Sequence, residues 1–434
     1  MVALTKRGMG AEFTVKRKGF SVLSGRQEIS RAVPPTRRTF AGHQHLCPIP
    51  IFATTTLAGL EEYLVAEIEQ LGGTRVEAGR RVVYCEGDKT FRYKANLHLR
   101  TGIRVLEEVG YFQANDEREL YAGLKKIDWS PWMEPTGNLW ITAVTQSDRF
   151  RNGVYLTQLF KDAVVDQFRE RTGERPNVNK DDADLYLHLH VDRENYVSAS
   201  LNSSGDGLHR RGYRRRTGGA PLNEVLAAGL LTIAGFDGER PFVDPMCGSG
   251  TIVAEAAMIA AHQAPGLNRE FAFQRWPDFD ADLWSSLRQA ALDAIRTPPY
   301  PIIGSDVDEL TVNLAEVTLS RTGLRPDVEL CAYPFALLPP IAIGAAPISE
   351  ENGGVMIMNP PYEERLKTGD IETFYSEIGD TLKQNWKGYT AWIISGNMDA
   401  IKSVGLRTTV KIPLMNGPIE VRYCRYDLYK GSKG

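Results

Sequence analysis

The sequence predicts an α/β protein whose C-terminal part is built on a doubly wound, mostly parallel sheet. Three observations carry this prediction: the apolar pair Phe242-Val243 runs into a glycine-rich loop and a helical pattern, the apolar stretch 302–304 ends in Ser305-Asp306, and the apolar stretch 354–358 ends in Asn359. Short apolar runs that alternate with helical patterns are typical of buried parallel strands. We expect the residues after these strands to meet at the carboxyl edge of the sheet, where open α/β sheets bind ligands.

The loop after Val243 has the composition of a cofactor cradle. Its glycines permit a tight turn and let backbone N–H groups approach a ligand, and Ser249 and Thr251 stand where a helix cap is expected. The loop lacks the G-x-G-x-x-G pattern of dinucleotide sites and the Gly-Lys-Ser/Thr pattern of phosphate-binding loops, so it favours another nucleotide-like cofactor over NAD or ATP. The candidate cofactor-binding residues of this loop are Asp244, Pro245, Met246, Gly248, Ser249, Gly250 and Thr251.

Asp306 is the candidate ligand for a ribose diol, because it is a carboxylate that follows the next strand. Its distance from the glycine loop exceeds the usual spacing of about 20 residues. Several prolines between the first helix and this strand indicate an insertion there. Asp306 could instead cap the helix that begins near Leu310, but Asp308 is the better placed residue for that cap.

Asn359-Pro360-Pro361-Tyr362 is the candidate catalytic motif. Two successive prolines fix the backbone and lack N–H donors, so nearby carbonyl groups can face a ligand. The side-chain oxygen of Asn359 and the carbonyl of Pro360 could accept both hydrogens of an exocyclic amino group, and Tyr362 offers a ring for stacking. The motif therefore indicates chemistry on the amino group of a nucleobase, although Asn-Pro is also a common turn signal at the end of a strand.

In this order, the three motifs resemble the class I S-adenosylmethionine-dependent methyltransferases, particularly the branch that methylates amino groups. The stretches 208–214 and 220–224 are similar to the start of the catalytic domain in the THUMP-containing RNA methyltransferases. The closest resemblance is to the bacterial large-subunit rRNA guanine-N2 methyltransferases. It implies a Rossmann-like class I methyltransferase domain with S-adenosylmethionine as its cofactor. Such enzymes commonly place an acidic residue after the third strand, where this chain instead offers Tyr333 or Phe335 for contact with the adenine.

The region before the catalytic domain predicts an α+β unit. Strand patterns occur at 51–54, 81–85, 139–144, 185–191 and 196–201, and helical patterns occur at 59–71 and 155–169. The resemblance divides the chain into a ferredoxin-like subdomain at 49–105, a THUMP RNA-binding domain at 106–205 and the methyltransferase domain at 206–434. The residues alone support only an α+β domain here, so RNA binding is what the resemblance implies.

A run of basic residues lies at the junction of the expected docking and catalytic domains. Arg210, Arg211 and Arg214 could bridge RNA phosphates, and Tyr213 could stack on a base. Most charged runs are merely solvated faces. The position at the junction favours an RNA-facing role for these four residues.

Composition places the chain among soluble enzymes. Its 434 residues allow two or three domains, and its five cysteines lack the paired spacing of a zinc cluster or a disulfide framework. No metal is therefore expected, and Cys247 is expected to be structural because no base lies beside it in the sequence. No apolar run approaches the length that spans a membrane, so we expect a cytoplasmic protein with no membrane partner.

Residues 1–48 are rich in arginine and lysine and poor in acids. This composition is typical of a disordered basic arm, of a targeting peptide, or of an upstream extension of the reading frame. A transit peptide would make the location organellar.

Together these inferences predict methyl transfer from S-adenosylmethionine to the exocyclic N2 of a guanine in large-subunit, 23S-type rRNA, free or within a pre-ribosomal particle. The reaction is expected to be a direct displacement on a flipped-out base, aligned by Asn359, Pro360 and Tyr362 without a strong general base. The alternatives are guanine-N2 methylation of tRNA, adenine-N6 methylation, and a catalytically idle RNA-binding factor in ribosome assembly. An oxidoreductase is disfavoured by the incomplete glycine pattern.

Overall fold

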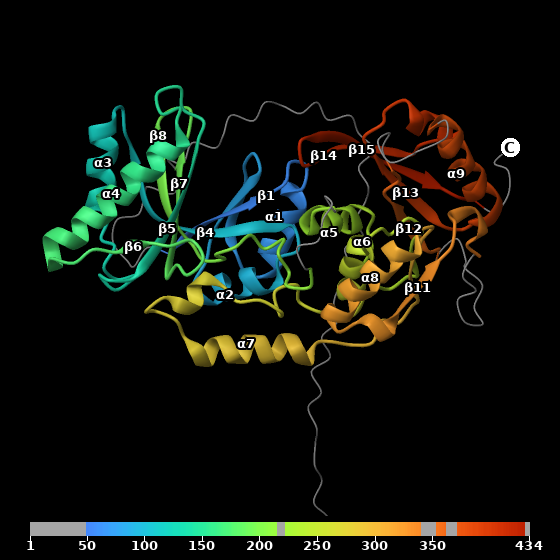
Figure 1. Ribbon diagram of the computed structural model, residues 1–434, viewed down its shortest axis with the longest axis horizontal. Helices are drawn as coiled ribbons and strands as arrows, with labels where there is room; N and C mark the ends of the chain where they lie inside the picture. The colour runs from blue at the N-terminus through green and yellow to red at the C-terminus, as the bar shows by residue number, and fades with distance from the viewer. Residues whose placement is uncertain (1–48, 215–221, 340–352, 362–370, 430–434) are drawn as a thin grey trace, which may run out of the picture. The chain divides into compact units, whose positions relative to one another are not determined.

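The computed structural model describes residues 49–214, 222–339, 353–361 and 371–429 of the chain. The basic arm at 1–48 and Tyr362 lie outside these ranges. The described residues form two sheets with helices, and the predicted α/β class is confirmed (Figure 1). Among these residues, no helix combines the length and the apolar character needed to cross a membrane.

The N-terminal sheet has eight strands in the order β2-β3-β1-β4-β8-β7-β5-β6. Its strands are β1 (Ile51–Thr56), β2 (Thr74–Ala78), β3 (Val82–Glu86), β4 (Gly102–Gln113), β5 (Asn138–Thr145), β6 (Asn177–Val178), β7 (Leu185–Val191) and β8 (Tyr196–Asn202). The accompanying helices are α1 (Glu61–Gln70), α2 (Lys89–His98), α3 (Glu117–Lys126) and α4 (Gly153–Thr172).

The long strand β4 joins the two expected N-terminal subdomains. It pairs with β1 on one side and with β8 on the other, both antiparallel. The predicted boundary between residues 105 and 106 therefore falls inside a strand, and the two parts share one continuous sheet.

Strand β7 shows how alternation builds this sheet. Leu185, Leu187, Leu189 and Val191 are buried, while the residues between them are only partly covered. One face of the strand therefore joins the core, and the other carries polar side chains such as His188.

His188 makes the stability of this sheet sensitive to acid. Burial, with smaller effects of Arg104 and His190, lowers the pKa of His188 from 6.5 to about 4. Its Nδ1 lies 2.9 Å from Thr142 Oγ1. Because the unfolded chain gains this proton near pH 6.5 and the folded chain only near pH 4, the free energy of unfolding should fall as pH drops between these values.

Lowering the pH from 7.5 to 5 should reduce the free energy of unfolding of both proteins. We expect this reduction to be smaller in His188→Asn than in the parent protein, by up to about 2 kcal/mol. Urea unfolding followed by circular dichroism at both pH values checks this. His98 and His209 also have pKa values lowered to about 4 and are present in both proteins, so the difference isolates His188. Equal pH dependence of the two proteins would contradict the assignment.

The C-terminal sheet has the order β11-β10-β9-β12-β13-β15-β14. Its strands are β9 (Phe242–Asp244), β10 (Ile302–Asp306), β11 (Val328–Ala332), β12 (Val355–Met358), β13 (Thr390–Ser395), β14 (Val410–Asn416) and β15 (Ile419–Asp427). Strands β9 to β13 are parallel, and β15 pairs antiparallel with β13 and β14. The helices of this region are α5 (Glu224–Ile233), α6 (Thr251–Ala260), α7 (Ala281–Asp293), α8 (Glu309–Thr322) and α9 (Ile371–Asn385).

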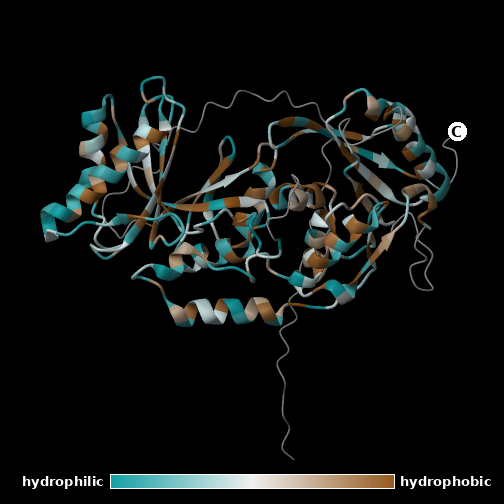
Figure 2. Ribbon diagram, in the orientation of Figure 1, coloured by the Kyte–Doolittle hydropathy of each residue, from teal (hydrophilic) through white to brown (hydrophobic). Residues whose placement is uncertain are grey.

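The insertion indicated by the prolines contains α7 and a short 3₁₀ helix, η2 (Ala272–Arg275). Helix α7 carries hydrophobic and hydrophilic residues in turn (Figure 2) and buries Trp284 and Ala291. The ring of Trp284 lies edge-on to Tyr93 of α2, with 5.9 Å between the ring centroids. The insertion therefore packs against the ferredoxin-like part of the chain.

Candidate active site

Strands β9 and β12 are neighbours at the centre of the C-terminal sheet, where Phe242 pairs with Val355 and Val243 with Met356. The chain builds β10 and β11 on one side of β9, then returns to build β12 and β13 on the other. Such a reversal opens a crevice at the carboxyl ends of the two strands. Asp244 ends β9 and Asn359 follows β12, so the glycine loop and the Asn359-Pro360-Pro361 motif both lie at this edge of the sheet.

Backbone and side-chain hydrogen bonds fix the glycine loop against the neighbouring strand β10. The N–H of Cys247 donates to the carbonyl of Ser305 (2.8 Å), and the N–H of Gly248 donates to Oδ2 of Asp306 (3.0 Å). The N–H of Gly250 donates to the carbonyl of Cys247 (2.9 Å), which closes the turn. Asp306 therefore anchors the loop to the end of β10.

Glycine is needed at two loop positions for different reasons. Gly248 and Gly250 both have positive φ, 54° and 79°. A Cβ at Gly250 would lie 2.9 Å from Cβ of Ala315 in α8, whereas a Cβ at Gly248 would meet open space. Gly250 thus allows close packing of the protein, and Gly248 leaves room for a ligand. This open cradle fits a nucleotide-like cofactor.

Gly248→Ala should therefore weaken the binding of S-adenosylhomocysteine about tenfold or more, while costing only the about 1–2 kcal/mol of a left-handed alanine. Gly323→Ala is the matched control, because Gly323 also has positive φ (82°) and open space but lies at the C-cap of α8. Calorimetric titration with S-adenosylhomocysteine compares the two variants. Equal affinities would show that Gly248 does not border the cofactor.

The predicted cap at the start of α6 is wrong in detail. Gly250 is the N-cap residue, and no side chain caps the helix. Thr251 is instead the first helical residue, and its hydroxyl contacts the guanidinium of Arg214. Pro245 is buried, while Met246 and Ser249 are half-buried. By contrast, Asp308 caps α8 as predicted, since it accepts from the N–H of Leu310 (3.1 Å).

Asp306 keeps acceptor capacity for a ligand. Its Oδ2 accepts from Gly248 and its Oδ1 from the N–H of Asp308 (3.1 Å). Each carboxylate oxygen has two lone pairs, so both oxygens can still accept from a diol. The side chain is half-exposed at the end of β10, which is compatible with a role in ribose binding.

Asp244, the single acid of the glycine loop, is deeply buried. It is 1% exposed, and its Oδ1 accepts from the N–H of Met246 (3.2 Å). Burial, and to a smaller extent the neighbouring charge of Asp306, raises the pKa of Asp244 well above its usual range. A cationic ligand at the crevice would oppose this shift, because a nearby positive charge favours the ionised carboxylate.

The motif after β12 begins on a rigid support. Every residue of β12 is buried, and the strand pairs with β9 and β13. Asn359 and Pro361 are half-buried and Pro360 is buried. A polar side chain and a carbonyl held on such a strand can serve as fixed acceptors for an amino group.

Other catalytic chemistries find little support among the described residues. Burial raises the pKa of Cys247, so its thiol stays protonated and is a poor nucleophile. Within the same ranges, no cluster of histidine, cysteine and acidic side chains could hold a metal ion.

The structure corrects part of the predicted RNA-facing stretch. Arg211 is 3% exposed and Tyr213 2% exposed, and both hydrogen-bond to Glu255 of α6. Side chains so buried cannot stack on a base or reach a phosphate. Arg214 is partly covered and pairs with Glu224 (2.9 Å). Arg210 alone of the four is largely exposed, beside Asp206 (2.7 Å).

Of the two aromatic candidates after β11, only Tyr333 faces solvent. Phe335 is buried and stacks on Trp386, with 6.0 Å between ring centroids, so it belongs to the core. Tyr333 is exposed next to the carboxyl edge and is the better candidate to contact an adenine.

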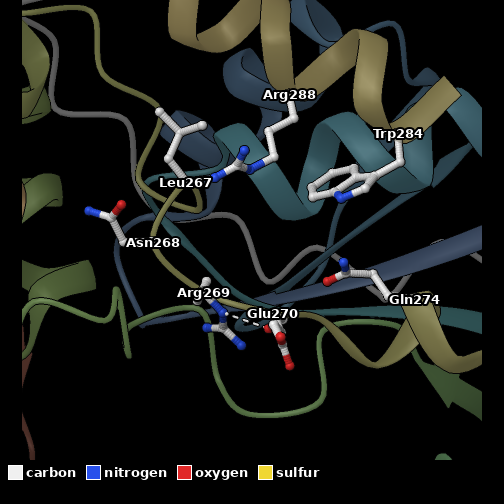
Figure 3. Close-up of a pocket in the computed structure, with 7 residues that line it drawn as sticks. All are labelled: Leu267, Asn268, Arg269, Glu270, Gln274, Trp284 and Arg288. Atoms are coloured by element: carbon white, nitrogen blue, oxygen red, sulfur yellow. Dashed lines mark hydrogen bonds between the residues drawn. The ribbon is translucent and has the colours of Figure 1, made fainter. Parts of the chain in front are cut away.

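Two hollows of the described surface lie away from this edge. One, of about 700 Å³, is lined by residues of the insertion (Figure 3): Leu267, Asn268, Arg269, Glu270, Gln274, Trp284 and Arg288. The other involves Ile302 and Val328, the first residues of β10 and β11, and so lies at the opposite edge of the sheet. Neither contains a residue of the glycine loop or of the Asn359-Pro360-Pro361 motif.

Comparison with known proteins supports the architecture. The family described as "RMKL-like, methyltransferase domain" matches residues 211–425, the RlmL ferredoxin-like domain matches 51–106, and the THUMP domain matches 114–198.

Two relatives illustrate the similarity. The chain is 37% identical to "Putative RNA methyltransferase slr0064" of Synechocystis sp., over 88% of this chain and 97% of that protein. It is 35% identical to "Ribosomal RNA large subunit methyltransferase K/L" of Syntrophotalea carbinolica, over 88% of this chain and 54% of that protein. The chain thus spans about half the length of the K/L relatives that it matches.

Solved structures show the same fold. SMU.472, called "a putative methyltransferase", was crystallised with S-adenosylhomocysteine; it is 26% identical with a TM-score of 0.77, over 88% of this chain and 99% of that one. A predicted N6-adenine-specific DNA methylase from Listeria monocytogenes is 28% identical with a TM-score of 0.77, over 87% and 96% of the two chains.

The fold and the strand-end motifs therefore define a class I methyltransferase, whose cofactor is S-adenosylmethionine. With the ferredoxin-like and THUMP domains in front of the catalytic domain, the chain belongs to the THUMP-containing class I RNA methyltransferases.

Proposed function

We propose that this enzyme transfers the methyl group of S-adenosylmethionine to the exocyclic N2 of a guanine in large-subunit rRNA. The observation that carries the proposal is the position of Asn359 at the strand next to the glycine loop, across the switch point between β9 and β12. An acceptor pair for an amino group beside a methyl-donor site is the arrangement that amine methylation needs.

The cofactor supplies a methyl group already activated by its sulfonium sulfur. Asn359 Oδ1 and the Pro360 carbonyl accept the two N2 hydrogens, which holds the guanine so that the nitrogen faces the donor. As the N–C bond forms and the S–C bond breaks, these oxygens stabilise the positive charge on N2. The extra proton on N2 would then leave to water, with S-adenosylhomocysteine as the other product.

RNA as the substrate class is supported by the THUMP domain at 114–198 and by the printed names of the relatives. Large-subunit rRNA is supported by the K/L relatives. Of the four residues expected to touch RNA, Arg210 is the one whose exposure suits phosphate contact.

Adenine-N6 methylation is the second candidate. Asn359 and Pro360 recognise an amino group and not the ring that carries it. One structural relative is called a predicted N6-adenine-specific DNA methylase.

The test is to incubate the purified chain with methyl-labelled S-adenosylmethionine and separate pools of undermodified rRNA and tRNA. The RNA is then digested and the labelled nucleoside identified. N2-methylguanosine from large-subunit rRNA is the expected result. Label in N6-methyladenosine or in tRNA would replace the proposed substrate. Retained RNA binding without transfer, to free rRNA and to pre-ribosomal particles alike, would favour an idle assembly factor.

A further inference from the structure

Helix α6, which begins directly after the glycine loop, is held by three arginines. Apart from Glu255 and the first residue, Thr251, the helix is apolar, and nearly all its residues are buried. Arg214 reaches its first residue, Arg211 its middle and Arg100 its carboxyl end. Arg100 belongs to the N-terminal region, between α2 and β4.

At the middle of α6, a buried network joins the helix to the N-terminal region. Nε of Arg211 lies 3.3 Å from Oε1 of Glu255, and the hydroxyl of Tyr213 donates to the same oxygen (3.0 Å). The remaining nitrogens of Arg211 donate to the carbonyls of Leu99 (3.2 Å) and Arg100 (2.5 Å). One guanidinium thus binds the backbone before β4 and the carboxylate of α6 at once.

The two ends of α6 are held in a similar way. Arg214 contacts the hydroxyl of Thr251, one helical turn before Glu255 and on the same face. Nη2 of Arg100 donates to the carbonyls of Gln263 (2.8 Å) and Met258 (3.3 Å), close to where the helix ends. A cation there also complements the helix dipole.

The backbone at Arg100 is itself fixed by an acid of α1. The carboxylate of Glu67 accepts from the N–H groups of Arg100 (2.8 Å) and Thr101 (3.2 Å). The contacts therefore run without a break from α1, through Arg100 and Arg211, to Glu255 and the loop that ends at Gly250.

Stability alone explains this network poorly. A buried ion pair is often no more stabilising than an apolar cluster of the same volume, and in some proteins buried ionic groups serve instead to fix one conformation. Here the fixed element carries the glycine loop on its first turn.

We propose that Arg211 and Glu255 are positioning residues that couple RNA binding by the N-terminal region to cofactor binding at the glycine loop. This inference rests on the proposed function. RNA held by the N-terminal region steadies α6, and the cofactor then meets a loop that has less freedom left to lose. By linkage, the cofactor strengthens RNA binding by the same factor.

The experiment measures the affinity of the full chain for S-adenosylhomocysteine with and without an unmodified in vitro transcript of bacterial 23S rRNA. In the parent protein, RNA should tighten this binding about 5-fold to 50-fold. In Glu255→Gln and Arg211→Met, RNA should change the affinity for S-adenosylhomocysteine by no more than about twofold. Tyr213→Phe removes one hydrogen bond and leaves the ion pair. RNA should tighten its binding of S-adenosylhomocysteine less than in the parent protein and more than in Glu255→Gln.

Glu107→Gln is the matched control. Glu107 of β4 forms a similarly buried ion pair with Arg92 (2.8 Å, side chains 6% and 5% exposed). Arg92 also pairs with Asp278 of the insertion (3.0 Å), so this network too joins the two parts of the chain, but its ion pairs do not include a residue of α6. Glu107→Gln should lower stability and leave the coupling factor unchanged. If Glu107→Gln also lost the coupling, general destabilisation would explain the loss in all the variants. That result would overturn the proposal.

Hydrogen exchange of residues 244–260 keeps the test decisive if a variant folds poorly. RNA should slow exchange of this segment in the parent protein and in Glu107→Gln. No slowing in the parent, or full coupling in both Glu255→Gln and Arg211→Met, would overturn the proposal. Failure of the parent to bind S-adenosylhomocysteine or RNA at all would instead overturn the proposed function.

Discussion

Asn359→Ala should lower the rate of methyl transfer about 100-fold or more, because it removes one of two acceptors that align the target amino group. The affinity for S-adenosylhomocysteine should stay within about twofold, since the residue follows β12 and the loop follows β9. Single-turnover transfer of labelled methyl groups measures the first quantity, and calorimetric titration measures the second.

Asn359→Asp separates an acceptor role from a structural one. A carboxylate also accepts two hydrogen bonds, so this variant should keep part of the activity that alanine loses. Asn313→Ala, at an exposed position on α8, controls for the loss of an amide at the surface. If the alanine variant at 359 transferred methyl groups as fast as the Asn313→Ala control, Asn359 would be a turn residue and nothing more.

The parallel strands of the catalytic domain could be predicted because buried parallel strands are continuous apolar runs. The segments that became β9, β10 and β12 all carry such runs, and the residues after them fall at one edge by topology alone. Asn359, Asp306 and the glycine loop therefore all follow strand ends at the same edge of the sheet.

Strand β4 was not predicted, because its sequence lacks a clean alternation. It carries Glu107 in the interior, where an acid normally argues against a strand. In the structure Arg92 neutralises this acid at 2.8 Å. This partner lies on α2, and the sequence around Glu107 does not indicate it.

The prediction that the basic stretch 210–214 faces RNA failed in part for the same reason. Arg210, Arg211 and Arg214 look alike in sequence, yet Arg211 is buried because Glu255, distant along the chain, supplies a carboxylate and the turn after α2 supplies two carbonyls. A signal was present, however. Glu255 is the single charge in the largely apolar segment 251–260, and a lone buried acid requires a partner.

Asp306→Ala should lower the affinity for S-adenosylmethionine about 10-fold to 100-fold. The carboxylate accepts the N–H of Gly248, and we assign it the ribose diol as well. Its loss frees the loop and removes the ligand contact, and hydrogen bonds to a charged group contribute about 1.5–3 kcal/mol each. Calorimetric titration with S-adenosylhomocysteine, and the KM for the methyl donor, both report this loss.

Asp308→Ala is the matched control, because Asp308 lies two residues after Asp306 and both side chains accept hydrogen bonds from backbone N–H groups. Asp308 caps α8 and binds Thr311 Oγ1 (2.6 Å), outside the crevice. Its loss should lower the melting temperature slightly without changing cofactor affinity. Asp306→Asn refines the result, since an amide keeps one acceptor for the loop but loses the charge that favours a diol. Equal cofactor affinities for Asp306→Ala and Asp308→Ala would remove Asp306 from the cofactor site and leave it only as the residue that holds the turn after β10.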